Sequence, residues 1–136
     1  MERIKVKRLY LQKKNINPLL NAFDNLVSQK KLQIAFSEKQ CVQIKGLVGS
    51  GLSFRLAAAF QKQNNSFLLV NENAEQAAYF LNDFERLLNP SDVLFFPASY
   101  RQPYAQETTD NANILLRAEV LKKLSTSKKP RIVVTS

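Results

Sequence analysis

Short apolar runs alternate with helical stretches along most of the chain, and this order constrains the fold more than any other feature. The apolar runs are residues 41–45, 67–70, 93–96 and 131–135, and the stretches of helical periodicity are 52–63, 74–88 and 110–124. Strands that alternate with helices of 10 to 15 residues imply right-handed crossovers and a mainly parallel sheet. The sequence therefore predicts a three-layer α/β fold, with helices on both faces of the sheet.

The helix at 74–88 has clear ends in the sequence. Asn73 and Gln76 resemble a capping box, an apolar face recurs at helical spacing, and Pro90 follows the end.

The sequence divides the chain into a basic arm, residues 1–15, and a folded subdomain, residues 16–136. Asn17 followed by Pro18 predicts a helix start, and the helix is expected to reach about Lys31. Residues 32–36 are predicted to be an edge strand, joined by a polar turn to the strand at 41–45.

Composition excludes several classes of chemistry. The chain of 136 residues has no histidine and one cysteine, Cys41, so it has no imidazole base, no internal disulfide and no multi-cysteine zinc site. Cys41 is expected to be a small buried strand residue. The basic N-terminus lacks the apolar segment of a secretory signal, so a cytoplasmic location is expected.

The net charge of +9 is concentrated at the two ends of the chain. Residues 1–31 carry eight basic against two acidic side chains and residues 111–136 carry six against one, whereas the middle is slightly acidic. Such ends fit either a nucleic-acid partner or ordinary solvated lysines. Because Ser136 directly follows a strand whose carboxyl end would carry function, we expect an N-terminal fragment of a longer polypeptide.

All three glycines of the chain lie within six residues, between the first predicted core strand and the first crossover helix. Gly46, Gly49 and Gly51 stand where a P-loop, with its pattern G-x-x-x-x-G-K-[S/T], would hold phosphates on backbone N–H groups. Leu52 occupies the position of the phosphate-binding lysine, and Ser53 occupies that of the Mg²⁺-binding hydroxyl.

Leu52 removes the charge on which phosphate binding depends. A lost charge-assisted contact of about 1.5–3 kcal/mol corresponds to at least a tenfold loss of affinity. None of the predicted strands ends in the acidic pair of a Walker B segment. The sequence favours a degenerate, structural phosphate loop with no catalytic residue; a weak anion site and a working nucleotide site are the alternatives.

The chain from residue 32 to residue 136 resembles the N-terminal, UvrB-related region of the bacterial transcription-repair coupling factors. The resemblance rests on four stretches: GLVGSGLSF, FLLVNENAEQAAYFLNDF, DVLFFPASYRQPYAQETTDNANILLRAEVLKKL and RIVVTS. Leu52 in place of the lysine, and a short connection flanked by Tyr100 and Tyr104, favour the coupling factors over UvrB.

This resemblance implies a degenerate RecA-like lobe that does not hydrolyse ATP. It further implies that ATP and Mg²⁺ belong to a motor elsewhere in an ATP-dependent DNA translocase. The partners implied for such a protein are RNA polymerase, UvrA and double-stranded DNA, in transcription-coupled nucleotide excision repair. The fragment itself is expected to need no cofactor and no metal.

A second candidate site follows the third predicted strand. Tyr100, Arg101, Gln102 and Tyr104 combine a cation, aromatic rings and an amide. The cluster could contact nucleic acid by stacking and phosphate binding, or it could pack against a neighbouring domain.

Overall fold

The computed structural model describes residues 17–63, 65–98 and 111–136. Within these ranges the elements follow one another as α1 (Asn17–Asp24), α2 (Val27–Ser37), α3 (Gly51–Lys62), β1 (Phe67–Val70), α4 (Ala74–Leu87), the 3₁₀ turn η1 (Pro90–Asp92), β2 (Val93–Phe96), α5 (Asn111–Thr126) and β3 (Ile132–Thr135). The predicted arm at 1–15 lies outside the described residues.

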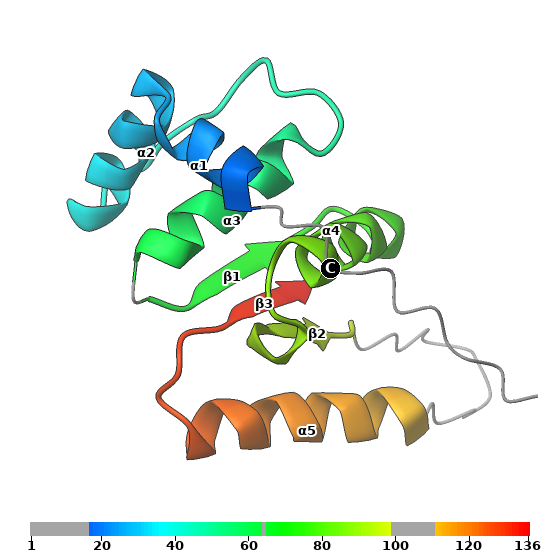
Figure 1. Cartoon of the computed structure of the whole chain (residues 1–136). Coiled ribbons are helices and arrows are strands. Elements are labelled where there is room, and N and C mark those ends of the chain that lie inside the picture. Colours follow the sequence, from blue (N-terminus) through cyan, green and yellow to red (C-terminus); the bar gives the residue numbers. More distant parts are fainter. Residues whose placement is uncertain (1–16, 64, 99–110) are drawn as a thin grey trace, which may run out of the picture.

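The three strands form one parallel sheet in the order β1-β3-β2 (Figure 1). Ile132 of β3 is in register with Phe67 of β1 and with Val93 of β2, so the central strand begins level with both neighbours. The sheet has two strands fewer than the sequence predicted, because residues 32–36 and 41–45 do not join it.

Helices cover both faces of the sheet, as predicted. On one face, α3 and α4 pack against the strands through a cluster that includes Ala57, Phe84 and Ile132, each less than 2% exposed. On the other face, Val120 of α5 packs on Leu94 of β2 and Val133 of β3. Because successive strand residues point to opposite faces, β3 contributes to both clusters.

The cap of α4 confirms the sequence prediction. The side chain of Asn73 accepts a hydrogen bond of 2.8 Å from the backbone N–H of Gln76, which satisfies one of the donors at the helix start. Such a cap is worth about 1 kcal/mol.

The predicted strand at 32–36 is wrong, since these residues belong to α2. Gln29, Leu32 and Ala35 recur every three residues and are all buried, which is a helical spacing. Their side of α2 meets α3, where Gln29 donates a side-chain hydrogen bond of 2.9 Å to the Arg55 carbonyl. The long helix predicted from residue 17 to residue 31 is likewise divided between α1 and α2.

The predicted strand at 41–45 is also wrong. These five residues have no strand assignment and are all exposed, so the alternation of Val42 and Ile44 buries neither side chain. Cys41 is exposed as well, in contrast to the expected buried position. A strand needs a neighbour for its backbone hydrogen bonds, and β1, the nearest strand in the chain order, pairs only with β3.

Candidate phosphate loop

The glycine-rich connection leads directly into α3. Gly46 and Gly49 have positive φ angles of 78° and 57°, in the left-handed region that other residues rarely enter. A Cβ atom added at either position would meet nothing within 4 Å. The backbone conformation, and not lack of space, therefore requires glycine at these two positions.

Gly51 differs from the other two glycines. It is the first residue of α3, and a Cβ atom there would lie 3.7 Å from Leu47 Cδ2, an ordinary van der Waals distance. Neither backbone conformation nor packing demands glycine at this position, although the P-loop pattern counts Gly51 as fixed.

Ser53 is held by a carboxylate of its own chain. Its hydroxyl is in the first turn of α3, is 1% exposed, and donates a hydrogen bond of 2.7 Å to Asp83 Oδ2 from α4. At this end of α3 the Gly51 N–H donates to the Val48 carbonyl, and the Phe54 N–H donates to the Ser50 carbonyl. Asp83 thus places a negative charge beside the positively polarised end of the helix, where a phosphate would otherwise be attracted.

This arrangement opposes phosphate binding in three ways. Leu52, half-buried at the lysine position, offers no charge. The Ser53 hydroxyl is already engaged, and the Asp83 carboxylate would repel an incoming anion. Gly46 and Gly49 thus keep their positive φ angles, while the adjoining Ser53 side chain bonds α3 to α4.

Sequence reasoning missed Asp83. It stands beside the apolar face of α4, next to the fully buried Phe84, and it is itself half-buried. An acidic residue at the border of an apolar helix face is the only sequence signal, and that signal does not identify a partner 30 positions away.

The loop lies at the carboxyl end of the sheet. In Figure 1 the start of α3 and the tips of β1 and β3 lie on the same side of the molecule. Asn71, just beyond β1, joins these tips: its backbone N–H and its side-chain Nδ2 each donate a 2.9 Å hydrogen bond to the Thr135 carbonyl. The candidate residues Tyr100, Arg101, Gln102 and Tyr104 lie outside the described residues.

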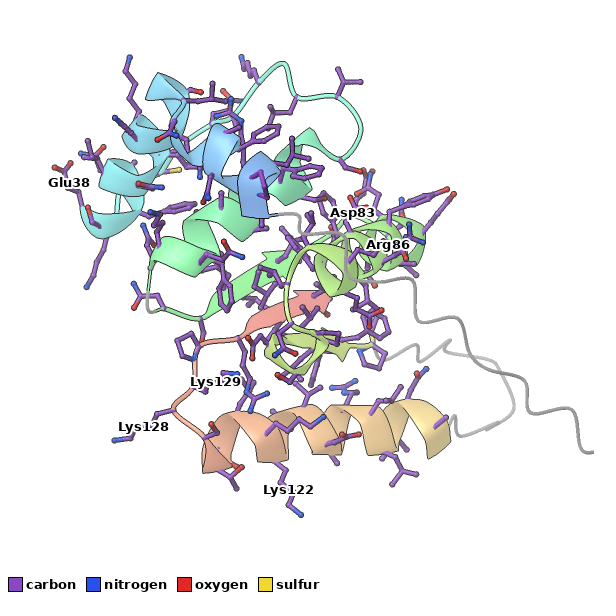
Figure 2. The ribbon with its side chains drawn as sticks, viewed as in Figure 1. Glu38, Asp83, Arg86, Lys122, Lys128 and Lys129 are labelled. Atoms are coloured by element: carbon purple, nitrogen blue, oxygen red, sulfur yellow. The ribbon has the colours of Figure 1, made fainter. Side chains whose placement is uncertain are left out.

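Basic side chains gather at the opposite end of the molecule. Figure 2 shows Lys122, Lys128 and Lys129 near the connection from α5 to β3, away from Asp83. Lys129 forms an ion pair of 2.5 Å with Asp92, and Lys123 forms one of 2.6 Å with Glu119. Part of the basic charge is therefore neutralised locally.

A metal centre or a membrane span would be recognisable in the described residues. No group of three or more His, Cys, Asp or Glu within them is placed to hold a metal ion. No helix of the described ranges combines the length and apolarity that a bilayer crossing requires.

Comparison with known proteins finds one curated relative. The chain is 32% identical over 83 residues to a transcription-repair-coupling factor of Rickettsia bellii, which is 60% of this chain and 7% of the relative's length. No family model matches the chain. No solved structure matches it. The sequence is thus related to a small part of a transcription-repair-coupling factor.

Proposed function

We propose that this chain is a non-catalytic lobe of a protein of the transcription-repair-coupling type, acting as a structural and interaction module in transcription-coupled nucleotide excision repair. The similarity to the Rickettsia protein supports the class of protein. The spacing of Gly46 and Gly51, which is that of a P-loop, and the connection of this loop to α3 support a degenerate RecA-like ancestry.

One observation carries the non-catalytic assignment. The side chains at the two positions that would bind phosphate and Mg²⁺ are an aliphatic group, Leu52, and a hydroxyl already bonded to Asp83. Removing a charged phosphate contact costs far more in phosphoryl transfer than in binding, because the charge on the phosphate oxygens must be stabilised in the transition state.

The remaining parts of the proposal concern a longer polypeptide. ATP and Mg²⁺ would be bound by its motor domain, and RNA polymerase, UvrA and double-stranded DNA would be its partners. The lobe would contribute surfaces for packing and contact, and its cytoplasmic location would follow from the repair process.

A hybrid protein tests this function. The chain is placed in the Rickettsia coupling factor instead of the matching segment, and repair of ultraviolet damage on transcribed DNA strands is measured in cells. We expect the hybrid to retain strand-selective repair, and a Leu52→Ala variant of the hybrid to hydrolyse ATP at the same rate. A soluble hybrid without strand-selective repair would refute the proposed function. A large fall in ATP hydrolysis with Leu52→Ala would refute its non-catalytic part.

A further inference from the structure

Gln29 is a fully buried polar residue in the contact between α2 and α3. Its side chain is 0% exposed, and it shares one side of α2 with the buried apolar residues Leu32 and Ala35. Glutamine is rarely buried, because an amide that leaves water must find new hydrogen-bond partners or lose free energy. The partners of this amide therefore decide what the contact between the two helices contains.

One half of the Gln29 amide has a partner in the protein. Its Nε2 atom donates a hydrogen bond of 2.9 Å to the backbone carbonyl of Arg55 in α3. A carbonyl oxygen can only accept hydrogen bonds, so the NH₂ group must face it and the orientation of the amide is fixed. The accepting atom, Oε1, consequently needs a donor of its own.

Two buried atoms at this contact have no hydrogen-bond partner in the described part of the chain. They are Gln29 Oε1 and Arg55 Nε. Both atoms belong to the two residues that the 2.9 Å bond already joins. Their roles are complementary, since Oε1 accepts a hydrogen bond and Nε–H donates one. The contact thus presents one acceptor and one donor to the same small region.

We infer that an ordered internal water molecule lies between α2 and α3, where it donates a hydrogen bond to Gln29 Oε1 and accepts one from Arg55 Nε. Buried waters in globular proteins occur at such places, where polar groups lack protein partners. The inference does not depend on the proposed function.

The chemistry of the two atoms selects water over other small ligands. A chloride or carboxylate ion could accept from Arg55 Nε, but it could not donate to Gln29 Oε1. A metal or ammonium ion could approach Oε1, but the guanidinium charge would repel it. Water performs both roles at once, and its share of liquid volume is only about 30 Å³.

Such a water would restrict how α2 lies on α3. The apolar contacts of Leu32 and Ala35 carry no directional requirement, whereas a hydrogen-bonded bridge needs its donor and its acceptor at set distances and angles. The bridged pair of Gln29 and Arg55 would therefore favour one alignment of the two helices.

Nuclear magnetic resonance of the 136-residue chain tests the inference. The Arg55 Nε proton and the Gln29 side-chain amide protons should each show a cross-relaxation peak to water with the sign of a long-lived bound molecule. Rotating-frame spectra separate these peaks from chemical exchange. In a high-resolution crystal structure, a water should lie about 2.7–3.2 Å from both Gln29 Oε1 and Arg55 Nε.

Other arrangements of these atoms would overturn the inference. One is a direct hydrogen bond between Gln29 Oε1 and Arg55 Nε, and another is a bond from either atom to a different protein group. Absence of the long-lived water peaks would overturn it as well.

A pair of variants provides an independent check. Gln29→Met keeps the length of the side chain but removes the acceptor, so the water peak at the Arg55 Nε proton should be lost. Gln63→Met is the matched control, because the Gln63 side chain also links the helices, through a 3.3 Å hydrogen bond to the Gln33 carbonyl. This control should keep the peak. A peak that survives Gln29→Met, or that both variants abolish, would contradict a water held by Gln29. If Gln29→Met does not fold, the peaks of the natural chain still decide the question.

Discussion

The hydroxyl of Ser53 donates a hydrogen bond of 2.7 Å to the carboxylate of Asp83, and this contact joins the first turn of α3 to the middle of α4. It fixes two helices that share one face of the sheet. The same contact occupies the hydroxyl that a P-loop would offer to Mg²⁺.

Removing the Ser53 hydroxyl should destabilise the fold. A hydrogen bond to a charged group contributes about 1.5–3 kcal/mol, and Ser53→Ala leaves a half-buried carboxylate without that donor. Urea denaturation of Ser53→Ala, Asp83→Ala and the double variant should give a coupling free energy of about 1–2 kcal/mol. Glu85→Gln, at an exposed site on α4, is the control and should change stability by less than about 0.5 kcal/mol. Additive effects of Ser53→Ala and Asp83→Ala would show that the contact does not stabilise the protein.

The natural chain should not be stabilised by nucleotide. We expect no rise in melting temperature with millimolar Mg-ATP beyond that seen with adenosine, because Leu52 and Asp83 disfavour the terminal phosphates. Adding Leu52→Lys to an Asp83→Asn variant should tighten Mg-ATP binding at least tenfold relative to Asp83→Asn alone, since it restores a charged contact. Clear stabilisation of the natural chain by Mg-ATP would contradict the structural assignment of the loop.

The glycines of the loop should respond differently to alanine. Gly46→Ala forces a side chain into the left-handed region and should cost about 1–2 kcal/mol of unfolding free energy. Gly51→Ala should be neutral or stabilising by up to about 1 kcal/mol, because its position is helical and its Cβ makes only ordinary contacts. Chemical denaturation of the two variants measures the difference, and a larger loss for Gly51→Ala would mean that the loop has another conformation.

Glu119 provides a prediction on pH. A hydrogen bond from Lys123, together with its positive charge, holds the pKa of Glu119 below the ordinary value of 4.5. Because the folded-state pKa is depressed, this contribution to stability is present above the unfolded-state pKa and is lost as the pH falls through the folded-state pKa. Lys123→Ala should raise the pKa of Glu119 toward its ordinary value, as followed by NMR titration. An unchanged pKa would exclude the Lys123 pair as the cause.

The helices and strands of the part of the chain where strands alternate with helices could be predicted from the sequence. The ranges of α3, α4, β1 and β2 agree with the predictions to within one or two residues. Their patterns are strong because one face of each element is apolar at a fixed period, and the Asn73 cap marks the start of α4. The glycine loop and the absence of the P-loop lysine could also be recognised in the sequence, since both depend on residue identity and spacing alone.

Tertiary contacts decided what the local pattern left ambiguous. The run at 32–36 fits either a strand or a helix, and it is helical because its buried residues meet α3. The run at 41–45 alternates as a strand does, yet it stays outside the sheet because none of the described strands pairs with it.

By itself, the sequence determined an α/β chain with a glycine-rich loop of P-loop spacing in which Leu52 takes the lysine position, because periodicity and side-chain chemistry are local properties. Only the tertiary structure decided that Asp83 engages Ser53 and that, among the described strands, β1 pairs with β3. Both are relationships between segments distant in sequence, and a hydrogen bond or a strand pairing exists only when the fold brings the two partners together.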